Sequence, residues 1–179
     1  MAGWKKSRSA NAWTFSAGDP RKEGPPTEFI WQVPDAVWAL DEKTRKKWFA
    51  QFDLSNDFCT IEDRWFLRGA LELPYSDRPG GWRWVLWSEV SQSVIEKYAE
   101  LEDVDGSNEP RMLGKLACTV PLQPDSIGQP VEIQFGPPDL RPSFFLPADS
   151  THPLAIEQRN GIDEDRYLKI IAVVIGLLP

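Results

Sequence analysis

Two charged side chains in one expected strand are the first candidates for chemistry. In the stretch RWFLRGALELPY, alternation places Arg68 and Glu72 on the same strand face. Residues four positions apart on a strand lie about 13 Å from each other, too far to pair directly. Their partners would instead be Glu132, or Glu157 and Arg159 in the expected helix THPLAIEQR. We favour a salt-bridge cluster that pins this helix to the sheet over a binding site.

The sole histidine, His152, opens an enzymatic alternative. A metal-independent pocket formed by Arg68, Glu72, His152 and Glu157, with Cys59 nearby, would bind an anionic group at the arginine. A glutamate would act as base and the histidine would shuttle a proton. A histidine before proline at a helix start more often makes a local hydrogen bond. No GxGxxG, GxxxxGK or GxSxG motif is present, which leaves no common basis for naming a reaction.

Metal ligands with suitable spacing are missing from the sequence. One histidine and two distant cysteines, Cys59 and Cys118, form neither CxxC nor HExxH. The loop EDVDGSNE offers carboxylates, but an EF-hand needs glycine at position six and glutamate at position twelve. Counting from Asp103, the glycine comes fourth and position twelve is Gly114. We therefore predict a solvated loop, no metal and no cofactor.

The stretch GGWRWVLWSEVS concentrates three tryptophans in one expected strand. Trp82 and Trp84 would point to one side and Trp87 to the other, so the three cannot all line one pocket. Large aromatic side chains are a common way to fill the core of a small domain. We predict core positions, with Trp84 as a possible pocket wall.

Periodicity and turn residues outline the elements that would position these side chains. The expected strands are DFCTIED, RWFLRGALELPY, GGWRWVLW, LGKLAC, VEIQF and SFFL, and the expected helices are DEKTRKKWFAQF, SVIEKYAEL, THPLAIEQRNG and DEDRYLKIIAVVIGLL. This order predicts an α+β fold: a mainly antiparallel sheet flanked by short helices, with the C-terminal helix packed on the sheet. Residues 1–12 would form a flexible N-terminal arm, and residues 13–179 a single domain.

Charge narrows the classes of partner. The chain of 179 residues has a net charge of −7, which disfavours nucleic acid and anionic membrane surfaces. It permits a basic protein partner, as in acidic immunity proteins that neutralise their targets. The apolar run IIAVVIGLL is too short to span a membrane and is expected to be buried, with a homodimer contact through the C-terminal helix as the minor alternative. With two cysteines and no secretory signal, a cytoplasmic location is expected.

Five stretches, in order, resemble the prokaryotic Domain of Unknown Function 2199 family. They are LSNDFCTIEDRWFLRGALELP, WRWVLWSEVS, LGKLACTVPLQPDS, GPPDLRP and HPLAIEQRNGI. The resemblance runs from about Trp13 to the C-terminus. The matching positions include Cys59, Arg68, Gly69, Glu72, Trp84, Trp87, Arg141, His152, Glu157 and Gln158.

The resemblance implies a bacterial protein without an established activity, and the departures from the family pattern are informative. Many members begin with CxxCGxxH, which resembles a small metal knuckle. Here Phe15, Gly18 and Lys22 stand at three of those positions, and none is a usual zinc ligand. The chain is therefore identified as a divergent member that lacks the knuckle. Together with the absence of a catalytic motif and the apolar C-terminal helix, this loss of polar family residues favours a non-enzymatic binding or interaction module.

Overall fold

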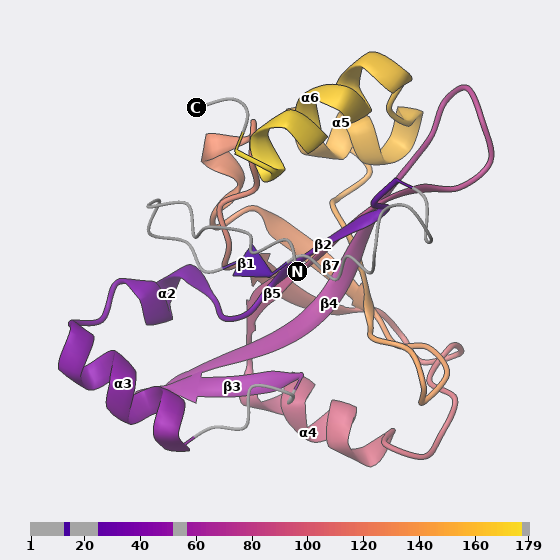
Figure 1. Ribbon diagram of the computed structural model, residues 1–179. Coiled ribbons are helices and arrows are strands. Elements are labelled where there is room, and N and C mark those ends of the chain that lie inside the picture. The colour runs from indigo at the N-terminus through magenta and orange to yellow at the C-terminus, as the bar shows by residue number, and fades with distance from the viewer. Residues whose placement is uncertain (1–12, 15–24, 52–56, 177–179) are drawn as a thin grey trace.

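The computed structural model describes residues 13–14, 25–51 and 57–176 (Figure 1). The strands are β1 (Trp13–Thr14), β2 (Glu28–Trp31), β3 (Phe58–Ile61), β4 (Arg64–Pro74), β5 (Gly81–Val90), β6 (Met112–Leu116), β7 (Pro130–Gln134) and β8 (Ser143–Phe145). The helices are α2 (Asp35–Trp38), α3 (Glu42–Gln51), α4 (Gln92–Glu100), α5 (Pro153–Asn160) and α6 (Glu164–Val174), with a 3₁₀ turn at Pro124–Ser126. The expected arm, residues 1–12, lies outside the described residues.

The sheet closes into a small barrel, which corrects the predicted flanked antiparallel sheet. The barrel runs from β5 through β6, β7 and β8 to β4, which pairs with β5 again. Two pairings are parallel: β2 with β5, and β8 with β4 at Ala70 and Ser143. The backbone N–H of Ala70 also donates to the carbonyl oxygen of Pro142 at 2.8 Å. The α+β class is confirmed, and the closure follows from this one long-range contact.

The hairpin of β4 and β5 forms the long central pair of the barrel. The two strands are antiparallel from the pair Trp65–Val90 to the pair Pro74–Gly81. The other edge of β5 is shared: β2 pairs with its first half and β6 with its second half. A strand with neighbours on both edges and cover on both faces is largely apolar, which explains the buried run of large side chains from Trp84 to Trp87 in β5.

Side-chain alternation divides this hairpin into an inner and an outer face. A Cβ on Gly69 would meet the Phe144 ring, so the face of β4 that carries Gly69 points into the barrel. Alternation puts Leu67 and Leu71 on this inner face, and both are fully buried. Arg68 and its cross-strand neighbour Trp87 lie on the outer face. The tryptophans of β5 are core residues, as predicted: Trp82, Trp84 and Trp87 are at most 2% exposed.

The helices cover the ends and one side of the barrel (Figure 1). Helix α3 begins after Asp41, whose carboxylate accepts the Thr44 N–H at 3.0 Å, and Trp48 of α3 donates its indole N–H to the Thr60 carbonyl. Helix α6 packs through Tyr167, whose ring contacts Tyr75 at 5.7 Å between centroids. The C-terminal helix is thus buried along one side.

No helix among the described residues is long and apolar enough to cross a membrane.

Candidate functional site

Arg68, the first predicted site residue, is buried on the outer face of β4. Only 4% of it is exposed, and its guanidinium carbon lies 4.5 Å from the centre of the Trp87 ring. Nη2 donates to the carbonyl oxygen of Gln32 at 2.9 Å. Within the described part of the chain, the buried Nε has no hydrogen-bond acceptor. Burial lowers the pKa of Arg68, and the negative charge of Asp57 opposes that shift.

Neither Glu72 nor His152 forms a hydrogen bond or an ion pair with Arg68. Glu72 is exposed near the end of β4. His152 is the N-cap of α5, where its Nδ1 accepts the N–H of Leu154 at 3.2 Å. This is the local hydrogen bond that a histidine before proline commonly makes.

Glu157 and Arg159 make contacts on their own side of the molecule. The Glu157 carboxylate lies 2.6 Å from Nε of Arg166, an ion pair that joins α5 to α6. Arg159 donates from Nη2 to the carbonyl oxygen of Ser150 at 3.0 Å. No hydrogen bond or ion pair joins any two of the five predicted polar residues.

The amide of Gln158, and not a charged residue, connects α5 to the barrel. Its Oε1 accepts the N–H of Leu146 and its Nε2 donates to the Phe144 carbonyl, both at 2.8 Å. One side chain thereby satisfies a donor and an acceptor at the end of β8.

Trp84, the predicted pocket wall, is 1% exposed and belongs to an aromatic cluster. Its ring lies 5.1 Å from Trp82, 5.6 Å from Trp31 and 6.0 Å from Phe29, in edge-to-face arrangements. Such pairs add to the free energy gained by burial.

Both cysteines are free, buried thiols close enough to Arg68 to feel its charge. Burial raises the pKa of Cys59 to about 12 and raises that of Cys118 well above its usual value. Because the thiolate is the nucleophile, burial keeps both sulfurs in the weakly nucleophilic thiol form near neutral pH.

Side chains that could bind a metal do not cluster among the described residues. Across residues 13–14, 25–51 and 57–176, no group of three histidine, cysteine, aspartate or glutamate side chains is placed to hold an ion. Phe15, Gly18 and Lys22 lie outside these ranges.

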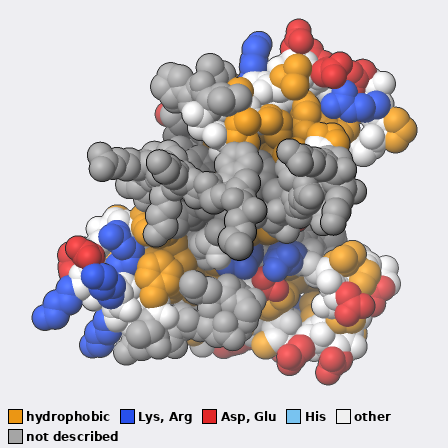
Figure 2. Space-filling model, viewed as in Figure 1, with side chains coloured by type: hydrophobic (Ala, Val, Ile, Leu, Met, Phe, Trp, Pro, Cys, Tyr) orange, Lys and Arg blue, Asp and Glu red, His pale blue; other side chains and the backbone are white. Residues whose placement is uncertain are grey.

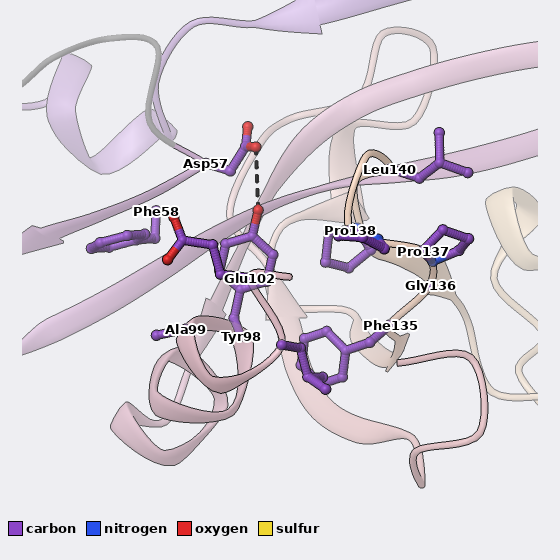
Figure 3. A pocket seen from close by; sticks show the side chains of 12 residues that line it. Asp57, Phe58, Tyr98, Ala99, Glu102, Phe135, Gly136, Pro137, Pro138 and Leu140 are labelled. Atoms are coloured by element: carbon purple, nitrogen blue, oxygen red, sulfur yellow. Dashed lines mark hydrogen bonds between the residues drawn. The ribbon is translucent and has the colours of Figure 1, made fainter. Parts of the chain in front are cut away.

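A cleft of about 430 Å³ lies between the end of α4 and the loop 135–142 (Figure 3). Phe58 and Leu140 stand at its rim, 39% and 62% exposed, and Phe135 is buried at its base. The complete lining is Asp57, Phe58, Tyr98, Ala99, Leu101, Glu102, Phe135, Gly136, Pro137, Pro138, Leu140 and Pro142. Concave, largely apolar surfaces with a few polar groups are typical of ligand sites.

Asp57 connects the cleft to the buried arginine. Its Oδ1 accepts from Nε of Arg141 at 2.9 Å and its Oδ2 accepts from the Tyr98 hydroxyl at 3.3 Å. Its backbone carbonyl accepts the N–H of Arg68 at 2.6 Å. The Tyr98 ring stacks on Phe135 with centroids 6.3 Å apart. This arrangement fixes the carboxylate, the phenol and the loop relative to one another.

Burial and the neighbouring carboxylate raise the pKa of Tyr98 from 10.0 to about 12. The folded state therefore keeps the phenolic proton between pH 10 and pH 12, where the unfolded chain has lost it. The contribution of Tyr98 to the free energy of unfolding is fully present below pH 10 and is lost as the pH rises through 12. We expect phenolate absorbance to show a component near pH 12 that Tyr98→Phe removes.

A Tyr75→Phe control should keep this late component. If Tyr98→Phe removes a component near pH 10 and leaves the late component in place, the Tyr98 hydroxyl is not buried beside the Asp57 carboxylate.

The sequence predicted Arg68 but missed Asp57, Tyr98 and the cleft. A signal was present, because two stretches that carry the family resemblance line the cleft. Asp57 and Phe58 belong to LSNDFC, and the loop residues from Gly136 to Pro142 are GPPDLRP.

A model of the bacterial family DUF2199, described as an uncharacterized protein conserved in bacteria, matches residues 16–162. The match spans both strands of the central hairpin and every cleft-lining residue, so the chain belongs to this family. No curated protein matches the chain, and no solved structure matches it.

Proposed function

We propose that this protein is a non-enzymatic binding module that docks a protein partner in the cleft between α4 and the loop 135–142. The observation that carries the proposal is the pair of exposed apolar side chains, Phe58 and Leu140, at the mouth of a concave surface. Exposed apolar groups that gather beside polar ones mark interaction sites. Clustered apolar anchors that fit a pocket supply most of the energy at protein interfaces.

The walls of the cleft are held before a partner arrives. The carbonyl oxygen of Gly136 accepts the N–H of Gly106 at 2.9 Å, and that of Pro142 accepts the N–H of Ala70 at 2.8 Å. Pro137 and Pro138 restrict the backbone between these two anchor points. A rigid surface loses little conformational entropy on binding, which favours affinity.

The enzymatic alternative stays a prediction that requires Arg68, Glu72, His152 and Glu157 to act together. Their contacts support structural roles. Arg68 stacks on Trp87, His152 caps α5, and Glu157 forms an ion pair with Arg166 of α6. One form of our proposal is a module that neutralises a basic partner, as immunity proteins do. We further propose that it acts in the cytoplasm, because its two cysteines are free thiols and the cytoplasm is a reducing compartment.

A homodimer through α6 is a separate surface hypothesis. Leu168 and Ile175 of this region are 53% and 36% exposed, which supports it.

Affinity capture from bacterial lysate tests the cleft. Leu140→Asp should reduce recovery of the partner by about tenfold or more, because truncating an anchor typically costs about 2 kcal/mol of binding. Leu113→Asp is the matched control, because Leu113 is 74% exposed on β6 and does not line the cleft. The proposal fails if wild type, Leu140→Asp and Leu113→Asp recover the same proteins in equal amounts.

A further inference from the structure

We infer that the occupant of the cleft is a basic segment, with a lysine or arginine side chain whose cation faces Glu102. This inference rests on the proposed binding function and adds the chemistry of the ligand. The aliphatic stem of such a side chain would lie on Leu140 and the neighbouring prolines, while the charged end would reach the opposite wall.

Glu102 supplies an uncompensated negative charge at the rim. It is exposed, and no hydrogen bond or ion pair connects its carboxylate to another residue of the described ranges. Figure 3 shows this carboxylate beside the Phe58 ring, across the cleft from Pro138 and Leu140. A cation placed there would also approach the face of an aromatic ring, which is attractive.

Asp57 contributes less to the choice of ligand because its charge is already engaged. Arg141 and the Tyr98 hydroxyl bind its two oxygens, and Arg68 lies behind it. Arg141 is thus ion-paired, and the group of Asp57, Arg68 and Arg141 carries one net positive charge. Discrimination between a cationic and a neutral ligand therefore depends on Glu102.

The end of α4 strengthens the negative potential. The last carbonyl groups of a helix carry partial negative charge, and Tyr98, Ala99, Leu101 and Glu102 line the cleft at this end. From residue 97 to residue 109 the chain has five acidic side chains and one lysine. That lysine, Lys97, is engaged by Glu100 at 3.0 Å and Glu109 at 3.5 Å.

Acidic and basic side chains are also unevenly distributed over the molecular surface. In Figure 2, acidic side chains gather around α4 and the loop after it, and basic ones gather on α3 at the other side of the view. A basic segment would be attracted to the α4 end before it makes contact. A neutral segment would desolvate the Glu102 carboxylate without a compensating partner, which is unfavourable.

Selection of random displayed peptides on immobilised protein tests the inference. Wild type and the Leu113→Asp control should enrich peptides that combine a lysine or arginine with an apolar residue. Glu102→Gln should lose the preference for the basic residue. Leu140→Asp should enrich none of these peptides.

A selected peptide is then synthesised with lysine and with norleucine, which keeps the stem and removes the charge. On wild type, calorimetry should give about three- to fivefold weaker binding for the norleucine peptide, the size expected for a partly exposed ion pair. On Glu102→Gln the two peptides should bind equally. The difference on wild type should shrink as the salt concentration rises.

The outcomes separate the inference from the function on which it rests. If the norleucine peptide binds wild type as well as the lysine peptide does, and Leu140→Asp abolishes both, the cleft is a docking site but its ligand is not basic. If the peptides bind Leu140→Asp as tightly as wild type, or if no peptide is selected, both the basic ligand and the docking cleft are rejected.

Discussion

Asp57→Asn is expected to lower the free energy of unfolding by about 2 to 3 kcal/mol at neutral pH, more than the removal of Arg68, the buried arginine whose charge it stabilises. Arg68 is 4% exposed, and Asp57 is the principal charge that favours its ionised form. Without this carboxylate, the guanidinium stays buried beside the positive charge of Arg141. An uncompensated buried charge is strongly destabilising, because its desolvation is no longer offset by an opposite charge.

Arg68→Met is expected to cost about 1 kcal/mol or less, because a buried charge replaced by an apolar side chain of similar length often has little net effect. The methionine can still pack on the Trp87 ring, and the orphaned Nε–H disappears. The substitution does remove the hydrogen bond that Arg68 donates to the Gln32 carbonyl oxygen.

Urea unfolding of both single variants and of the double variant completes the cycle. In the Arg68→Met background, Asp57→Asn should be milder by about 1 kcal/mol or more, since no buried charge remains to be neutralised. Arg141→Ala measures the exposed part of the cluster and should cost less than about 1 kcal/mol. Equal effects of Asp57→Asn in the two backgrounds would show that the aspartate does not stabilise Arg68.

Local patterns in the sequence predicted most of the elements, but they missed β2 (Glu28–Trp31) and did not indicate how the sheet closes. Alternation identified β4 and β5 and the faces of Trp82 and Trp87, because both features repeat along a single strand. The barrel depends instead on a single bridge between Ala70 and Ser143. Strand β8 is three residues long, and nothing in so short a stretch specifies a distant parallel partner.

The candidate site was predictable only in part, because local sequence patterns do not specify contacts between distant segments. Arg68 stood out as a charge among apolar neighbours. Its environment is assembled from distant segments, since Tyr98 is 41 positions and Arg141 is 84 positions from Asp57. On α5 the sequence favoured charged residues as the link to the sheet. The structure uses Gln158, because an amide both donates and accepts at the unpaired backbone groups of β8.

Gly69→Ala is expected to destabilise the protein by about 3 kcal/mol or to prevent folding, because the barrel closes where a Cβ would stand. Such a Cβ would overlap the ring of Phe144 and lie 2.7 Å from the carbonyl oxygen of Pro142. The ring fills the barrel interior, and the carbonyl belongs to the backbone that bonds to Ala70. Neither group has room to withdraw without opening the pairing of β4 and β8.

The contribution of the ring is separable from that of the backbone by combining Gly69→Ala with Phe144→Ala. Phe144→Ala alone should cost about 3 to 5 kcal/mol through the cavity that it leaves. The double variant should be more stable than the sum of the two losses predicts, because the new methyl group enters space that the ring has vacated. Gly136→Ala is the matched control, because a Cβ there meets no atom within 4 Å. If Gly69→Ala unfolds at the same urea concentration as Gly136→Ala, β8 does not press against β4 and the barrel is not closed at this point.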